Sequence, residues 1–206
     1  MTDDGHSTDR VQVWIERLAA GDEQACAELI NHAAARLASL TEGMFQDYRR
    51  LGRWEQTEDV CQNASVRLWN ALKSTRPTTP AEFYRLAALQ IRRELIDQIR
   101  RHFGPEDIGA NLASNAWEGD STSPRSAAYD RPQSTHDPAK LSGWVEFHEQ
   151  VALLPEDERS AFDLIYYQGL AQAEAAAILG ISERTLKRRW LSARLTLGKA
   201  LEGAPP

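Results

Sequence analysis

Several features that define common classes of protein are missing from this sequence of 206 residues. No stretch approaches the roughly 18 consecutive apolar residues that a membrane-spanning helix needs, so we expect no membrane insertion. The first ten residues are polar and acidic, unlike a signal or transit peptide. The only cysteines, Cys26 and Cys61, are too few for a disulfide scaffold or a zinc site. We therefore expect a cytoplasmic protein in which both thiols are reduced and packed in the core.

Motifs of catalysis are missing as well. The five histidines are dispersed without the spacing of metal ligands, and there is neither a Gly-rich phosphate loop nor a GxSxG turn. Carboxylates in the helical segments stand where helix caps and helix dipoles explain them. The sequence therefore predicts a protein that is not an enzyme and has no cofactor and no metal site.

Basic residues are in the minority overall, which at first argues against a nucleic-acid binder. There are 24 Lys and Arg against 30 Asp and Glu, a formal net charge of −6. The distribution changes this interpretation. Residues 182–199 hold six bases and one acid, a local charge of +5, and residues 83–101 hold five arginines and two acids, a local charge of +3. Low overall charge limits non-specific binding to DNA. The charge distribution therefore favours a protein that binds DNA conditionally over one that binds DNA on its own.

The chain divides into two helical segments and a polar stretch between them. Residues 10–103 and 141–203 repeat apolar residues at helical steps, and no segment alternates as a strand does, so the fold class is all-α. Residues 104–140 hold four prolines and six acids against three bases, with no periodicity. This composition predicts a flexible acidic linker. We expect two small helical domains, residues 10–103 and 141–203, after a polar tail of residues 1–9.

The second segment has the pattern of a helix-turn-helix. One helix is predicted from Pro155 to about residue 167, ending at Gly169, and a short helix over 172–179 follows it. Ser182 is a good N-cap for a long last helix. Two helices joined by a tight turn that contains glycine make this motif.

The last helix has a core face and a basic face. At 100° per residue, Leu186, Ala193, Leu197 and other apolar residues, Ala200 among them, fall on one side. Arg184, Lys187 and Arg188 fall opposite. On the second helix of such a motif, a basic face predicts contact with DNA, whereas on an isolated helix it is usually a solvated surface.

A second basic helix is predicted over residues 82–101. Its apolar residues recur at steps of three or four, and its arginines cluster beside that stripe. The planar fork of arginine suits phosphate recognition. The polar loop before it, residues 74–80, is stiffened by two prolines and could hold an unstacked base. Taken alone, such a helix could equally be a solvated surface with Glu–Arg pairs.

These segments resemble bacterial RNA polymerase sigma factors of the extracytoplasmic-function (ECF) type, in the sigma-70 family. Glu58-Asp59-Val60-Cys61-Gln62-Asn63, followed by Arg67-Leu68-Trp69, is similar to the family's E-D-[LV]-x-Q-E…R-L-W helix. In the family this helix belongs to region 2 and docks on the clamp coiled coil of core polymerase. The resemblance implies core-binding roles for Asp59, Gln62, Asn63 and Arg67.

Residues 83–101 look like the family's promoter-melting helix, whose pattern ends in R-N-x-x-x-D-x-x-R-R. Here the segment reads Arg92-Arg93-Glu94-Leu95-Ile96-Asp97-Gln98-Ile99-Arg100-Arg101, with Arg93 where the family usually has Asn. The residues to which the resemblance gives a role in −10 recognition and melting are Arg76, Phe83, Arg85, Arg92, Arg93, Arg100 and Arg101.

The segment from Leu154-Pro155-Glu156-Asp157-Glu158-Arg159 to Ala176-Ala177-Ile178-Leu179-Gly180-Ile181-Ser182 is similar to the family's region 4 pattern, L-P-x-x-x-R…G…I-A-x-x-L-G-[IV]-S. In the family this module reads the −35 element in the major groove. The residues implied in that contact are Ser182, Arg184, Thr185, Lys187, Arg188 and Arg189.

The resemblance implies a transcription initiation factor that binds promoter DNA and the clamp and flap surfaces of core polymerase. It also implies a monomer when free, with an anti-sigma factor among the partners of the family. The residues alone leave two alternatives open. One is a stand-alone helix-turn-helix regulator that binds an operator as a dimer. The other is a helical adaptor that uses its basic faces for protein contacts.

Overall fold

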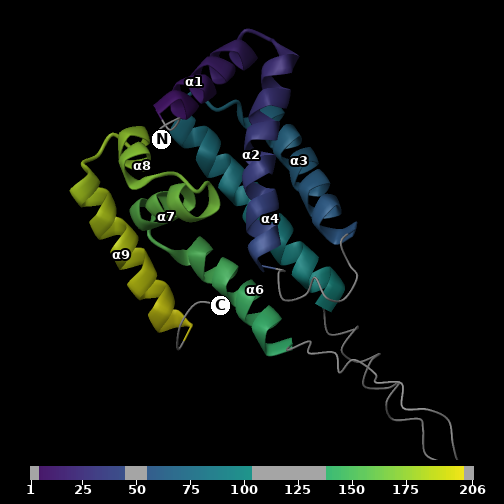
Figure 1. Ribbon diagram of the computed structural model, residues 1–206, viewed down its shortest axis with the longest axis vertical. Coiled ribbons are helices and arrows are strands. Elements are labelled where there is room, and N and C mark those ends of the chain that lie inside the picture. Colours follow the sequence, from purple (N-terminus) through teal and green to yellow (C-terminus); the bar gives the residue numbers. More distant parts are fainter. Residues whose placement is uncertain (1–4, 45–54, 104–137, 202–206) are drawn as a thin grey trace, which may run out of the picture.

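The computed structural model describes residues 5–44, 55–103 and 138–201, and side chains over 8–40, 61–100 and 143–201. All regular secondary structure in these ranges is helical, which confirms the all-α class (Figure 1). The elements are α1 (Gly5–Ala19), α2 (Glu23–Met44), α3 (Glu55–Thr75), α4 (Pro80–Phe103), α6 (Pro138–Leu153), α7 (Glu156–Phe162), the π-helical turn η2 (Asp163–Tyr167), α8 (Gln172–Ile178) and α9 (Glu183–Ala200).

Two of the boundaries predicted from the sequence differ from the structure. The tail was expected to end at residue 9, but α1 begins at Gly5, and Thr8 Oγ1 donates a hydrogen bond to Glu174 of α8 at 2.8 Å. The linker was expected to run to residue 140, but α6 begins at Pro138. Proline fits the first turn of a helix, where its missing N–H is not needed. Residues 104–137 lie outside the described part of the chain.

The helices on both sides of the linker pack into shared cores. We call α1–α4 the N-terminal half and α6–α9 the C-terminal half. One buried cluster joins Ile91 and Leu95 of α4 to Val151 and Phe162 of the C-terminal half. A second cluster joins residues of α1–α4 to residues of α7, η2, α8 and α9. Figure 1 shows α4 beside α2 and α3, with α7 and α6 on its other side. The two halves are therefore closed against each other.

The helix that begins after Pro155 does not run as one α-helix to residue 167. It is α-helical to Phe162 and then widens into a π-helical turn, in which Gln168 N–H donates to the carbonyl of Asp163 at 3.1 Å. Gly169 ends it with φ +67°, as predicted. Periodicity could not reveal the turn, because one extra residue only shifts the buried face locally. The shift places Asp163 in the interior, where it is almost fully buried.

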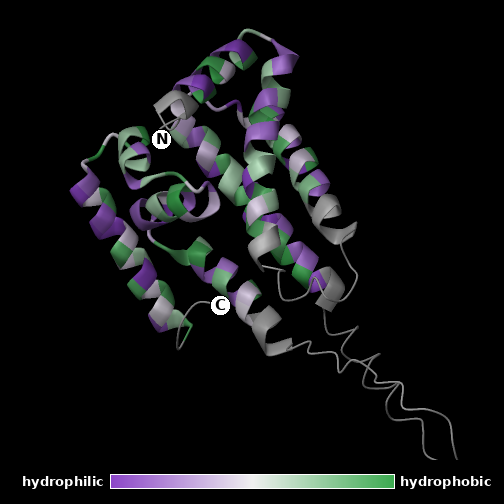
Figure 2. Cartoon of the chain, in the orientation of Figure 1, coloured by the Kyte–Doolittle hydropathy of each residue, from purple (hydrophilic) through white to green (hydrophobic). Residues whose placement is uncertain are grey.

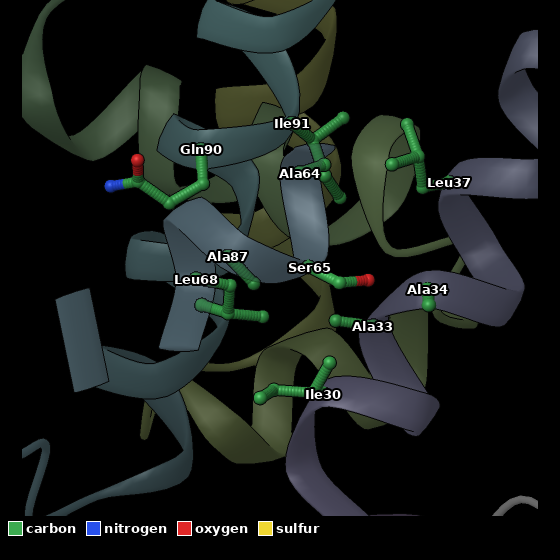
Figure 3. Close-up of a pocket in the computed structure, with 10 residues that line it drawn as sticks. All are labelled: Ile30, Ala33, Ala34, Leu37, Ala64, Ser65, Leu68, Ala87, Gln90 and Ile91. Atoms are coloured by element: carbon green, nitrogen blue, oxygen red, sulfur yellow. The ribbon is translucent and has the colours of Figure 1, made fainter. Parts of the chain in front are cut away.

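A small hollow lies where α2, α3 and α4 meet (Figure 3). Small side chains such as Ala33, Ala64 and Ala87 line it, and it has room for no more than about one water molecule. Within the described ranges, no three His, Cys, Asp or Glu side chains gather as a metal ion would need. No helix in the same ranges has both the length and the hydropathy to cross a membrane.

Candidate nucleic-acid interface

The turn between α8 and α9 is held by backbone geometry. Gly180 adopts φ +63°, a left-handed conformation that glycine takes without steric cost. Ile181 N–H donates to the carbonyl of Ala176 at 3.0 Å, and Gly180 N–H to that of Ala177 at 3.1 Å. This pair of bonds is a Schellman motif, which satisfies carbonyls at the end of α8. The turn fixes how α9 leaves α8, as a helix-turn-helix requires.

Ser182 caps α9, as the sequence predicts. Its Oγ accepts a hydrogen bond from Thr185 N–H at 3.2 Å and lies 2.9 Å from Thr185 Oγ1. The cap satisfies one of the unpaired N–H groups at the start of the helix. Both hydroxyls sit at the first turn of α9, next to the basic face.

The basic side chains of α9 divide into exposed and packed ones. Arg184, Lys187 and Arg188 are exposed, and Lys187 lies 3.5 Å from Glu183 in a weak pair on the surface. Arg189 instead turns toward α7 and pairs with Asp157 at 2.6 Å, leaving 24% of its side chain exposed. Figure 2 shows hydrophilic residues concentrated in the first turns of α9. Three exposed cations at one end of the helix form a patch that can meet phosphates or base edges.

The opposite face of α9 packs as predicted, with one exception. Leu186, Ala193 and Leu197 are buried, and Trp190 packs partly against the same cluster. Ala200 was expected in the core but is exposed. It lies in the last turn of α9, where helix periodicity continues but no described side chain covers it.

Residues 76–79 form the loop before α4 and are ordered by a capping network. Glu82 Oε2 accepts from Thr78 N–H at 2.7 Å and from Thr78 Oγ1 at 3.0 Å, and Glu82 N–H donates to Thr79 Oγ1 at 3.2 Å. The hydrogen bond from Thr78 N–H is the main reason that the pKa of Glu82 lies below its ordinary value. Arg76 has φ +45°, a left-handed conformation that is uncommon for a non-glycine residue. The loop thus holds Arg76 exposed and in a defined conformation.

Three of the predicted −10 residues on α4 are exposed. Arg93 points to solvent. Arg85 lies 3.3 Å from Glu156 of α7, and Arg100 pairs with Glu149 of α6. The side chain of Arg101, also predicted, lies outside the described residues.

Two of the predicted −10 residues are inside the molecule. Phe83 is fully buried in the second core cluster, and Arg92 is 4% exposed. The Arg92 guanidinium pairs with the Asp163 carboxylate at 2.5 Å and lies 5.1 Å from the centre of the Tyr167 ring. In this closed arrangement neither side chain is presented to a ligand.

The buried ion pair sits beside a buried histidine. Tyr167 Oη lies 2.6 Å from Nδ1 of His148. Burial lowers the pKa of His148 to about 3, so this imidazole is neutral at pH 7. Burial also raises the pKa of Asp163 to about 6, against the opposing influence of Arg92. The charges in this region cost solvation energy that the ion pair offsets only in part.

The predicted core-binding residues lie on α3. Gln62 and Asn63 are exposed. Arg67 is about one-third exposed and pairs with two acids of α4, Glu94 at 2.8 Å and Asp97 at 2.6 Å. The side chain of Asp59 lies outside the described residues. Arg67 therefore joins α3 to α4, while Gln62 and Asn63 face outward.

The structure also exposes apolar residues on α3 that the sequence analysis did not assign to a surface. Val66 and Trp69 are 54% and 43% exposed, and Lys73 Nζ lies 3.5 Å above the Trp69 ring. Val66, Trp69 and Lys73 follow Gln62 at successive steps of four, three and four residues, which places all four on one side of the helix. The sequence signal for this exposure was that Val66 and Trp69 fall outside the buried stripe of Ala64, Leu68 and Leu72.

Comparison with known proteins gives a family for this arrangement. The family described as ECF sigma factor matches residues 8–203. The RNA polymerase sigma-H factor of Pseudomonas aeruginosa is 26% identical over 195 residues, covering 93% of each chain. Two solved structures are also similar. CnrH, in complex with the cytosolic domain of CnrY, is 20% identical with a TM-score of 0.38, over 94% of this chain and 97% of that one. RpoE of Bartonella quintana, in complex with the anti-sigma factor NepR, is 21% identical with a TM-score of 0.35, over 87% and 96%.

Proposed function

The chain belongs to the ECF sigma factor family, whose members act in transcription initiation, and we propose that it directs core RNA polymerase to promoters by reading two DNA elements. The observation that carries this proposal is the exposed basic patch of Arg184, Lys187 and Arg188 at the start of a capped helix-turn-helix. If this patch were absent, the family match alone would not say which surface contacts DNA.

The −35 element is assigned to α9. Its first turns enter the major groove, where Arg and Lys pair with guanine or with phosphate. Ser182 and Thr185 lie at the same end and reach a phosphate or a thymine methyl group. Arg189 is held by Asp157, so its part is to fix α9 on α7 unless that pair opens.

The −10 element is assigned to α4 and the loop before it. Arg76, Arg85, Arg93 and Arg100 supply positive charge for an opened strand, and Phe83 and Arg92 join them when the two halves separate. The ordered loop at 76–79 is suited to an extruded base, since unstacking a base costs a few kcal/mol that protein contacts must offset.

Core polymerase is assigned to α3. Gln62 and Asn63 provide polar contacts, and the exposed Val66 and Trp69 provide the apolar centre that a protein interface needs. Arg67 positions this helix against α4 through Glu94 and Asp97. None of these steps makes or breaks a covalent bond.

The partners follow from the same assignment. We propose that the free chain is a monomer that binds duplex DNA weakly until core polymerase is present, and that an anti-sigma factor is among its regulators. Low net charge fits this conditional binding, because it limits attraction to non-specific DNA.

The test is transcription in vitro with purified core polymerase and a pool of genomic promoters. The expected result is binding to core and initiation from a defined subset of promoters. If the chain neither binds core nor initiates transcription, the proposal is lost. The matched variants are Arg188→Ala, which should impair −35 recognition and leave core binding intact, and Trp69→Ala, which should do the reverse.

A further inference from the structure

Two acids in the first turn of α7 hold two residues of α9 that are three positions apart. The guanidinium of Arg189 donates to Asp157 Oδ2 at 2.6 Å, and Ser192 Oγ donates to Glu158 Oε1 at 2.8 Å. Residues three apart are neighbours on a helix surface, so both contacts lie on the same side of α9. Arg189 directly follows Arg188, the last cation of the exposed patch. The two contacts therefore act on α9 next to its basic end.

These polar contacts add a restraint that the apolar contact between α7 and α9 supplies less strictly. Trp190 of α9 stacks on Phe162 of α7, with ring centroids 5.1 Å apart. Apolar burial is not directional, whereas a hydrogen bond depends on angle as well as distance. The pair of hydrogen bonds thus restrains the rotation and the tilt of α9 on α7.

The contact at Glu158 costs stability. Its second oxygen, Oε2, is buried and takes no hydrogen bond from the described residues. A buried carboxylate oxygen without a partner loses solvation energy, and an apolar side chain at this position would avoid that loss. A contact that fixes geometry at the expense of stability is expected beside a functional surface.

We propose that Asp157 and Glu158 are positioning residues, which set the rotation of α9 and thereby decide which bases its exposed cations select. This inference rests on the proposed function, since it concerns the sequence preference of the same helix. Hydrogen bonds to base edges specify sequence, whereas contacts to phosphate do not, and overall affinity depends largely on charge. A small rotation of α9 therefore weakens the choice among bases more than it weakens affinity for DNA.

The proposal gives Arg189 a role through Asp157 rather than through DNA. Exchanging the two residues, in Asp157→Arg with Arg189→Asp, restores the ion pair in the opposite direction and leaves the net charge unchanged. If Arg189 touched DNA itself, an aspartate at its position would repel the phosphate backbone, and the exchange would not restore binding. The exchange therefore separates a positioning role from a direct contact.

The experiment selects preferred sequences from a pool of randomised DNA duplexes with the full chain at low ionic strength, without polymerase. For each variant we then compare affinity for the selected duplex with affinity for the random pool. Asp157→Ala removes one restraint, and Ser192→Ala removes the other. The control is Glu156→Ala, which removes an acid from the same turn whose described ion pair is with Arg85 of α4. Thermal denaturation checks that each variant is folded at the assay temperature.

Relative to the control, we expect the ratio of selected to random affinity to fall about fivefold in Asp157→Ala and about threefold in Ser192→Ala. Affinity for the random pool should stay within about twofold of the control, and the exchange should recover most of the ratio that Arg189→Asp alone loses.

A parallel loss on both kinds of DNA, an unchanged ratio, or no recovery by the exchange would overturn the positioning role. The absence of any preferred duplex for the original chain would overturn it as well. Failure of promoter-directed transcription with core polymerase leaves these comparisons standing, so the two proposals fail separately.

Discussion

The two basic helices of this molecule, α9 and α4, differ in how far their cations are exposed and paired. The cations at the start of α9 face solvent, and the helix is fixed by its own turn, its cap and the core beneath it. Three arginines of α4, Arg85, Arg92 and Arg100, are paired with acids from the other half, and Arg92 is buried. Local charge alone therefore does not define a binding surface; what lies opposite the charge decides whether it is available.

The difference suggests an order of events. The α9 patch is available to duplex DNA in the closed chain, whereas Phe83 and Arg92 of α4 become available only when the halves separate. Both helices have basic segments of similar strength in the sequence, +5 and +3. The contrast between the exposed cations of α9 and the buried Arg92 of α4 can be tested by substitution.

The largest effect is expected at the buried pair. Asp163→Ala leaves the Arg92 guanidinium buried without its partner, which lowers the free energy of unfolding by about 3–5 kcal/mol. Replacing both residues, in Arg92→Met with Asp163→Leu, should cost much less, since apolar groups of similar volume replace the charges. Urea denaturation of the full chain measures both. An equal loss of stability in the single and the double variant would contradict this prediction, because the loss would then not come from an unpaired buried charge.

Acid should destabilise the closed chain through His148. Its pKa in the folded state is about 3, below the ordinary value of 6.5, so the unfolded chain takes up a proton that the folded chain excludes. Stability from this group is complete above pH 6.5 and is lost as pH falls toward 3. At pH 5 the loss is about 2 kcal/mol.

The measurement is urea denaturation at pH 7 and pH 5, compared with His148→Gln. Glutamine does not titrate, so this variant should lose about 2 kcal/mol less than the original chain over this interval. Burial also lowers the pKa of His32, but that residue is common to both proteins and cancels in the comparison. Asp163 acts in the opposite sense between pH 6 and 4, because its raised pKa favours the protonated folded state. Equal losses in the two proteins would show that His148 is not buried as described.

The exposed helix should respond through binding rather than stability. Arg188→Ala should weaken binding of a −35 duplex in the presence of core polymerase by about tenfold, as expected for loss of one base or phosphate contact. The free energy of unfolding should stay within about 0.5 kcal/mol, since the side chain is exposed. A titration of labelled duplex gives the first value and urea denaturation the second. Unchanged duplex affinity would remove Arg188 from the interface.

The smallest effect is expected at the cap of α9. Ser182→Ala removes the acceptor for Thr185 N–H and should lower the free energy of unfolding by about 1 kcal/mol. Ser182→Gly should cost less, because glycine is tolerated at the N-cap. Thermal denaturation compares the two. Identical costs would mean that the serine oxygen has no capping role.

Much of the fold could be predicted from the sequence because its signals are local. Ser182 marks the start of α9, Gly169 marks the end of the helix before it, and steps of three or four mark the buried faces. The π-helical turn could not be predicted, because a single added residue leaves the apolar pattern nearly unchanged.

For the candidate site, the sequence could predict which residues share a face of one helix, but not which residues of different helices meet. The cations of α9 were identified with their face, since their exposure depends on the same periodicity as the core. The pairing of Arg92 with Asp163 joins residues 71 positions apart, and no local pattern carries that information. The exposure of Val66 and Trp69 was missed for a related reason, because the buried stripe does not say which remaining positions form a surface.

The most direct measurement compares single-stranded and duplex DNA binding by the full chain, with and without core polymerase, on a promoter selected by transcription from the genomic pool. We expect weak binding of duplex and of single-stranded DNA by the free chain, with both increasing strongly once core polymerase is added. Single-strand binding by the free chain as tight as that of its complex with core would contradict this expectation, since the buried Phe83 and Arg92 would then add nothing when the halves separate.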